Sequence, residues 1–115
     1  MHENGKIDYV EQPGGHLPAT KAFYAEAFGW TFTDYGPTYA AFNEGLDGGF
    51  DGDVASGLKV PMVILFSTDL EAILAKVEAA GGTITRPIFS CPGGRRFQFK
   101  DPAGNELGVW GDPSE

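Results

Sequence analysis

The feature that most constrains this chain is a repeat of its first half in its second half. When the sequence is superposed on itself at an offset of 53 residues, six identities fall within about 21 positions. They pair Val10 with Val63, Leu17 with Leu70, Ala19 with Ala72, Ala22 with Ala75, Ala27 with Ala80 and Gly29 with Gly82. Because self-similarity at a fixed offset indicates a repeated structural unit, we expect two similar halves, residues 7–53 and 60–111. With 115 residues the chain has the size of one domain, so we predict a single domain over residues 1–115.

Both halves show the same order of predicted elements. The first half contains a predicted strand at 7–13, a helix at 17–28 and strands at 30–35, 38–43 and 48–52. The second half contains a predicted strand at 60–66, a helix that follows the cap Thr68-Asp69 and ends at about Ala80, and strands at 83–89, 95–100 and 106–111. The pattern therefore predicts an α+β fold of two βαβββ modules.

Charge and hydropathy argue against two classes of partner. Sixteen acidic and eight basic residues give a net charge of −8, which repels nucleic-acid phosphates and anionic membrane surfaces. The longest apolar run, residues 60–66, is far shorter than the roughly 20 residues that a membrane-spanning helix needs. The lone Cys91 cannot form an intrachain disulfide, and the polar start of the chain resembles no signal segment. We expect a cytoplasmic protein that binds neither nucleic acid nor a membrane.

Two segments of the sequence resemble a known family. Residues 22–30 are Ala-Phe-Tyr-Ala-Glu-Ala-Phe-Gly-Trp, and residues 95–107 are Arg-Arg-Phe-Gln-Phe-Lys-Asp-Pro-Ala-Gly-Asn-Glu-Leu. At this separation they are similar to the vicinal oxygen chelate superfamily, which contains glyoxalase I, bleomycin resistance proteins and extradiol dioxygenases. The resemblance covers nearly the whole chain. It implies that the two βαβββ modules form a curled mixed sheet with a small-molecule pocket in its concave face, and that the protein is a homodimer.

The resemblance also indicates where a divalent metal would bind. In metal-binding members, His, Gln or Glu stands on the first strand of each half, and carboxylates stand late in each half. The corresponding positions here are Tyr9, Met62, Gly108 and a residue near Gly49 or Phe50. None of these carries a usual ligand of a divalent ion. His2 is expected in a chain end outside the pocket, and His16 in the turn before the first helix. We therefore expect no catalytic metal in the usual place and no other cofactor.

Strand alternation predicts which side chains share the pocket. If Tyr9, Met62 and Gly108 point inward, so do the residues two positions away on the same strands. The predicted pocket residues are Tyr9, Glu11, Phe50, Met62, Ile64, Glu106 and Trp110. The intervening residues are all apolar and are expected to face the helices; they are Val10, Val63, Leu65, Leu107 and Val109. This predicts a largely apolar cavity with a few polar anchors.

Glu11 is the candidate catalytic residue. Within an apolar strand face its proton affinity would rise, which suits a general base or a hydrogen-bond anchor. The alternative is that Glu11 bonds a neighbouring backbone or basic group and serves only the fold. Glu106 is expected at the pocket rim or paired with Arg95 or Arg96, and residues 101–105 are expected to form a structural turn.

Three functions remain open at this point. The first is a small-molecule-binding protein without the usual catalytic metal, as in the resistance branch of the family. The second is a lyase, isomerase or dioxygenase that uses a non-standard metal site or Glu11 as general base. The third is an interaction module whose pocket is filled by its own side chains.

Overall fold

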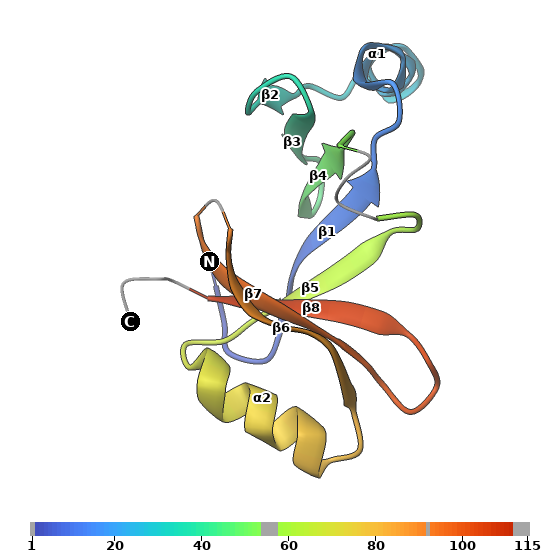
Figure 1. The fold of residues 1–115 in the computed structure, drawn as a ribbon. Helices are drawn as coiled ribbons and strands as arrows, with labels where there is room; N and C mark the ends of the chain where they lie inside the picture. Colours follow the sequence, from blue (N-terminus) through green and yellow to red (C-terminus); the bar gives the residue numbers. More distant parts are fainter. Residues whose placement is uncertain (1, 54–57, 92, 112–115) are drawn as a thin grey trace. The chain divides into compact units, whose positions relative to one another are not determined.

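Each half of the chain forms a strand, a helix and three further strands, as the repeat predicts (Figure 1). The computed structural model describes residues 2–53, 58–91 and 93–111. The first module contains β1 (Ile7–Pro13), α1 (Leu17–Phe28), β2 (Thr33–Asp34), β3 (Tyr39–Asn43) and β4 (Asp47–Asp51). The second contains β5 (Met62–Phe66), α2 (Leu70–Ala79), β6 (Thr83–Cys91), β7 (Gly94–Lys100) and β8 (Glu106–Gly111). The predicted α+β fold of two βαβββ modules is confirmed.

The two modules have the same strand order and the same register. The strands lie in the order β1-β4-β3-β2 in the first module and β5-β8-β7-β6 in the second. In each, the first and last strands pair in parallel, and the other neighbours pair antiparallel. Glu11 lies opposite Gly49 on the β1–β4 pair, and Ile64 lies opposite Gly108 on the β5–β8 pair. The structural repeat thus extends to this residue pair, although the two halves are offset by 53 residues on the first strand and by 59 on the last.

The chain forms two compact units, each with its own core. One unit is Tyr9–Met62, and the other combines the segment that ends at Asp8 with the chain from Val63 onward. The boundary falls within β1, whose first two residues belong to the second unit. In the sections below each unit is described by itself.

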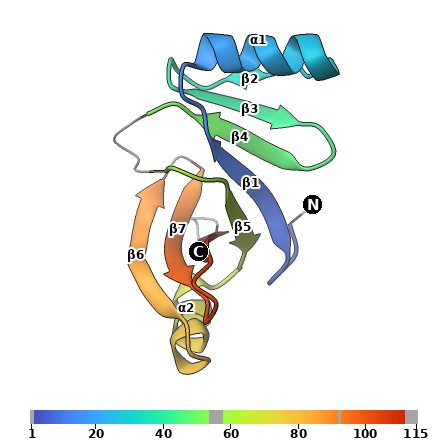
Figure 2. The ribbon, with the colours of Figure 1, turned by 90° about the vertical axis from the view of Figure 1, so that its right-hand side faces the viewer.

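The core of the first unit consists mainly of aromatic rings beside α1, and Figure 2 shows this helix alongside β2, β3 and β4. Its buried residues are Leu17, Ala40 and Phe50, against which Tyr24, Trp30, Phe32 and Phe42 pack. Trp30 stacks on Tyr24 with ring centroids 4.7 Å apart. The strand expected at 30–35 is only two residues long, because Trp30 and Phe32 turn into this cluster and the Thr31 amide donates to the Glu44 carboxylate instead of to a strand.

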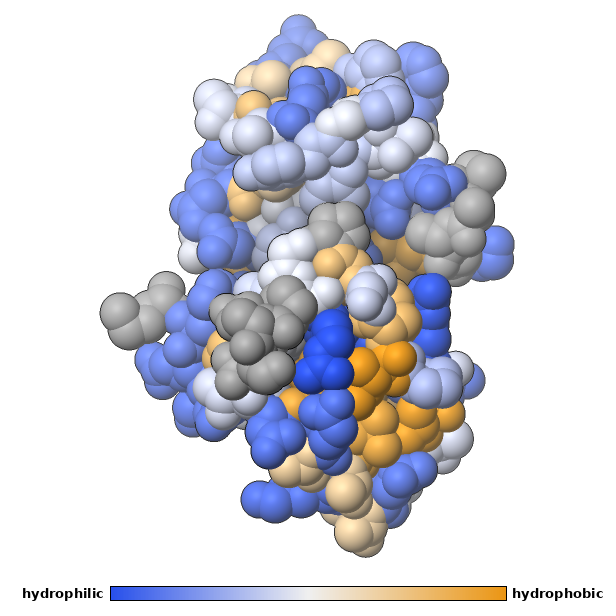
Figure 3. Space-filling view, turned by 60° about the vertical axis from the view of Figure 1, so that its left-hand side comes forward, coloured by the Kyte–Doolittle hydropathy of each residue, from blue (hydrophilic) through white to orange (hydrophobic). Residues whose placement is uncertain are grey.

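The core of the second unit lies between α2 and its sheet. Leu70, Phe97, Phe99 and Val109 are buried there, surrounded by the partly buried Leu65, Ile73, Leu74, Val77, Ile84, Ile88 and Leu107. Leu65, Leu107 and Val109 thus face the helix, as strand alternation predicts. Because many of these side chains are only partly covered, hydrophobic surface shows beside hydrophilic side chains in the lower part of Figure 3.

Local signals in the sequence mark where the helices and the last strand begin and end. The Asp69 side chain accepts a bond of 3.0 Å from the Ala72 amide at the start of α2, and Gly29, with φ of 74°, ends α1. Before the last strand, Asp101 accepts bonds from the amides of Ala103 and Asn105. These bonds and the bond from the Gly104 amide to the Asp101 carbonyl confirm that residues 101–105 form a turn. The Asn105 side chain and the amides lower the pKa of Asp101. In the described part of the chain, no helix is long and apolar enough to cross a membrane.

Candidate functional site

Glu11 belongs to a chain of three hydrogen-bonding side chains on the first sheet. Its side chain is buried, with the residue 8% exposed. The Tyr39 hydroxyl donates to Glu11 Oε2 over 3.1 Å, and the Tyr9 and Tyr39 hydroxyl oxygens are 2.6 Å apart. Because a phenol carries one proton and Tyr39 gives its proton to Glu11, Tyr9 must donate to Tyr39. We call these three residues the Glu11–Tyr39–Tyr9 network.

Gly49 makes room for this network. A Cβ atom at Gly49 would lie 2.3 Å from the Tyr39 hydroxyl oxygen, well inside van der Waals contact. Only a glycine on β4 therefore lets the Tyr39 ring lie across the strand and reach Glu11 on β1. Tyr39 is not among the pocket residues that strand alternation predicts. The available signal was the pair Gly48-Gly49 within a strand, since glycine inside a strand often marks a close approach of another group.

Burial keeps both phenols of the network protonated. Desolvation is the largest cause that raises the pKa of Tyr39, and the bond with Tyr9 and the charge of Glu11 raise it further. Desolvation also raises the pKa of Tyr9; its hydrogen bond to Tyr39 opposes this, and the charges of Glu11 and Asp47 add to the rise. At neutral pH the network therefore combines neutral O–H donors with a carboxyl group.

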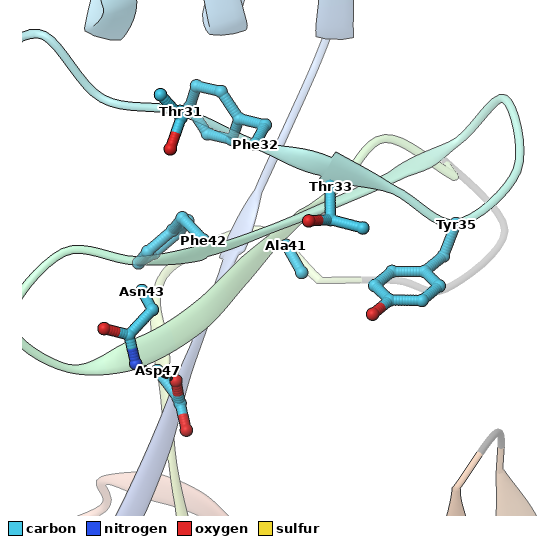
Figure 4. A pocket seen from close by; sticks show the side chains of 8 residues that line it. All are labelled: Thr31, Phe32, Thr33, Tyr35, Ala41, Phe42, Asn43 and Asp47. Carbon is cyan, nitrogen blue, oxygen red and sulfur yellow. Dashed lines mark hydrogen bonds between the residues drawn. The ribbon is translucent and has the colours of Figure 1, made fainter.

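A hollow of about 310 Å³ lies along the same sheet and is drawn in Figure 4. Its lining residues are Thr31, Phe32, Thr33, Tyr35, Ala41, Phe42, Asn43 and Asp47. Tyr35 lies at one end, and Asn43 with its hydrogen-bond partner Asp47 lies at the other. Thr33 pairs with Ala41, Ala41 with Gly49, and Gly49 with Glu11. Because directly paired residues share a face of a sheet, Thr33 and Ala41 of the lining share the face of Glu11, whereas Phe32 and Phe42 of the lining pack in the aromatic core.

The other predicted pocket residues of the first unit do not join this network. Phe50 lies on the opposite face, in the aromatic core beside α1, and Met62 is buried at the start of β5. Of the positions that the family resemblance assigns to metal ligands, Gly49 and Gly108 offer no side chain. Within residues 2–53, 58–91 and 93–111, no three His, Cys, Asp or Glu side chains gather as a group that could hold a metal ion.

In the second unit, Ile64, Glu106 and Trp110 alternate with residues that face α2. Glu106 is exposed, and its Oε2 atom accepts bonds from Thr85 at 2.7 Å and Gln98 at 3.3 Å. The expected partnership with an arginine is wrong. Arg95 binds Glu71 on α2 at 2.8 Å, and Arg96 donates to the Gln98 side chain at 3.0 Å. The β7–β8 register explains this, because Gln98 pairs with Gly108, two positions from Glu106, whereas Arg96 and Arg95 pair with the more distant Trp110 and Gly111.

Trp110 has neighbours that the sequence did not indicate. Its indole N–H donates to Asp8 over 2.8 Å, and its ring contacts Phe66 and His2 with centroid distances of 5.4 and 5.0 Å. His2, expected in a chain end, thus contacts Trp110, one of the predicted pocket residues. The first residues of the chain bind the second unit through β5, as Gly5 donates its amide to the Phe66 carbonyl over 2.8 Å.

Comparison with models of protein families identifies the superfamily of this chain. The model of the glyoxalase/bleomycin resistance protein/dioxygenase superfamily matches residues 6–109 of the chain. The chain belongs to this superfamily. No curated protein sequence matches it significantly.

Several solved structures share the fold of this chain. The chain is similar to an NAD-dependent benzaldehyde dehydrogenase from Legionella pneumophila, with a TM-score of 0.74, 15% identity and coverage of 90% of this chain and 97% of that one. It is similar to methylmalonyl-CoA epimerase from Mycobacterium tuberculosis, with a TM-score of 0.70, 11% identity and coverage of 97% and 91%. An Mn(II)-bound glyoxalase from Novosphingobium aromaticivorans gives a TM-score of 0.67 at 24% identity, over 97% of this chain and 40% of that one. At these identities the likeness shows the fold alone.

Proposed function

We propose that this member of the glyoxalase/bleomycin resistance protein/dioxygenase superfamily binds a small, partly apolar molecule on the open face of its first sheet, without a divalent metal in the usual place. The observation that supports this proposal is the Glu11–Tyr39–Tyr9 network. The buried carboxyl group and the phenol oxygens provide oriented acceptors, since both phenol protons are used within the network, and the rings of Tyr9 and Tyr39 provide apolar surface. Small-molecule sites commonly combine such surface with a few placed polar groups.

The donor set supports recognition without a metal. Divalent ions of the family's kind are bound by imidazole and carboxylate donors. The positions in question carry Tyr9, Met62 and two glycines, and the raised pKa of Tyr9 opposes formation of the phenolate that would bind a cation. The place of a carboxylate at Gly49 is already taken by the Tyr39 hydroxyl. These residues do not fit the metal centre of the metal-dependent members.

A fragment screen by protein-observed NMR tests the binding proposal. We expect hits to shift the backbone amides of Thr33, Ala41 and Gly49, which line the face between the hollow and Glu11. Replacing Glu11 with Gln keeps the shape and removes the charge, and should weaken binding of these hits by about 10- to 100-fold, the range for losing one hydrogen bond to a charged group.

The matched control is Glu78→Gln, an equal change of charge on the exposed side of α2. Its affinities should equal those of the wild type. If Glu11→Gln retains full affinity while its amide spectrum stays native, the network is not the binding site. Tyr39→Phe provides a second variant and should weaken the same fragments, since it removes the donor to Glu11.

An isomerase-type proton transfer is the second candidate function. The observation that favours it is the continuous path of hydrogen bonds of 3.1 and 2.6 Å from Glu11 through Tyr39 to Tyr9. A carboxylate can accept a proton as a general base, and the hydrogen bond from a phenol holds that carboxylate in position. In D₂O, an active base would exchange deuterium into the acidic C–H position of a bound fragment. Exchange should vanish in Glu11→Gln with the fold intact, and unchanged exchange would remove Glu11 from the chemistry.

Two further features belong to the same proposal. We infer a homodimer in the cytoplasm, as the family resemblance implies. Phe23 and Phe28 on α1 support the dimer, because they are 57% and 64% exposed on a helix that is otherwise rich in alanine. Sedimentation of the wild type and of a Phe23→Ser/Phe28→Ser variant would distinguish a dimer from a monomer.

A further inference from the structure

The second unit contains an aromatic corner that the chain itself occupies. Phe66 on β5 and Trp110 on β8 meet at 70°, with centroids 5.4 Å apart. The imidazole of His2 lies in this corner, stacked on Phe66 at 5.0 Å and 21°, and edge-on to Trp110 at 5.0 Å and 88°. A flat ring of this size thus contacts both walls in the geometries that aromatic pairs prefer.

Asp8 forms the polar end of the corner. One carboxylate oxygen accepts the Trp110 indole N–H over 2.8 Å, and the other lies 2.7 Å from His2 Nδ1. The Asp8 side chain is only 10% exposed, so the Trp110 bond fixes its orientation. Because a carboxylate can only accept hydrogen bonds, the ring nitrogen that meets it must carry a hydrogen. The corner therefore selects a planar ring with an N–H group at its edge.

The attachment of the chain does not depend on the His2 ring. Asn4 exchanges two hydrogen bonds with Thr68, one to its hydroxyl and one from its amide, at 3.0 and 2.8 Å. Gly5 and Lys6 pair with the backbone of Phe66 at 2.8 and 3.2 Å. The His2 side chain itself is 48% exposed. The ring can thus leave the corner while the residues after it stay bound.

We propose that Phe66, Trp110 and Asp8 form a second small-molecule site, which takes planar N–H heteroaromatic rings of the imidazole class, and that His2 is its displaceable internal ligand. This site is separate from the one proposed around Glu11. His2 is a tethered competitor. The apparent affinity for a free ligand is the intrinsic affinity multiplied by the fraction of molecules in which His2 has left the corner.

Titration with free imidazole, followed through the Trp110 indole N–H resonance of untagged protein, tests the proposal. The chain has two tryptophans, and Trp110→Phe assigns the signal. In His2→Ala we expect saturable binding, with half-saturation at roughly tenfold lower imidazole than in the wild type. Adding Asp8→Asn to His2→Ala should weaken this binding. Thiazole, a ring of the same size without N–H, should give no saturable shift.

His16→Ala is the matched control, because it removes the other histidine of the chain, and it should titrate like the wild type. A second measurement does not depend on any variant. The ring protons of His2 in the wild type should be shifted by the Phe66 ring and should return to free values as imidazole is added. Equal titrations of His2→Ala and the wild type, or equal binding of thiazole and imidazole, would overturn the proposal.

Discussion

At the scale of single residues, the phenols beside Glu11 determine how the protein responds to alkali. The folded-state pKa of Tyr39 lies above its ordinary value of 10.0, chiefly because the hydroxyl is desolvated. Below pH 10 both the folded and the unfolded chain keep this proton, and the stabilisation is complete. Above pH 10 the unfolded chain loses the proton and the folded chain keeps it, so stability falls as pH rises.

We predict that the free energy of unfolding in urea falls above pH 10 by up to about 1.4 kcal/mol per pH unit for Tyr39, with a smaller share from the more exposed Tyr9. Tyr39→Phe should remove most of this slope. At pH 7 the same variant should be less stable than the wild type by about 1–3 kcal/mol, because buried Glu11 loses a donor. Tyr35→Phe, at a residue 67% exposed, is the control; an unchanged slope in Tyr39→Phe would contradict the prediction.

The sequence predicts Glu11 better than its partners. Alternation along one strand is enough to assign Glu11 to a face, and the structure buries it. Tyr39 follows from the register between β3 and β4, which alternation within a strand cannot provide. His2 is a similar case, because its contacts depend on Phe66 and Trp110, more than 60 residues away in the chain.

At the scale of elements, strand β8 leaves no room for a side chain at the start of β7. A Cβ atom on Gly94 would lie 2.1 Å from the Gly111 carbonyl oxygen. A flexible side chain could move away from such an atom, but a paired strand cannot. The start of β7 therefore has no space for any side chain beyond hydrogen.

We predict that Gly94→Ala lowers the free energy of unfolding by about 3 kcal/mol, at the upper end of the usual range for overpacking. Lys100→Ala, at the exposed end of the same strand, should change it by less than about 0.5 kcal/mol. Urea unfolding of both variants measures the difference. A Gly94→Ala protein as stable as Lys100→Ala would show that β7 and β8 can separate at this point at little cost.

Element boundaries are predictable where a local signal sets them. Helix α1 and strand β8 have the predicted ends, because Gly29 stops the helix and the Asp101 turn begins the strand. Strand β2 is shorter than predicted, because Trp30 and Phe32 contribute more by packing with Tyr24 and Phe50 than by extending a strand. Tertiary packing of this kind has no signature in the local sequence.

At the scale of the whole molecule, the net charge of −8 should make stability depend on salt. Carboxylates that repel one another favour the unfolded chain, and salt screens this repulsion. Two surface ion pairs, Lys21–Asp34 and Arg95–Glu71, favour the folded chain and are weakened by salt, but each contributes little to stability.

We predict that the melting temperature rises by a few degrees between about 10 mM and about 500 mM NaCl, a range over which the screening length falls severalfold. Glu78→Lys, which makes the net charge less negative at an exposed position, should melt higher than the wild type at low salt and respond less to added salt. Differential scanning fluorimetry measures both. A melting temperature that falls with salt would mean that ion pairs outweigh the repulsion.

The repeat predicts the order of elements in both modules but not the boundary between the compact units. That boundary falls between Asp8 and Tyr9, within β1. Nothing in residues 7–13 marks it, since the strand is continuous and its β-forming residues extend across the division. The division depends on distant partners, which is why a reading of the first strand alone misses it.

The bond between Asp8 and Trp110 joins residues 102 positions apart. On a ribosome, the opening residues of the chain emerge first, yet Phe66, Thr68 and Trp110 emerge long afterwards. Strands β1 to β4 can pair while translation continues, whereas the segment before β1 must wait until Trp110 has been synthesised. A segment that precedes β1 in the chain thus finds its neighbours only after strands β1 to β4 have been made.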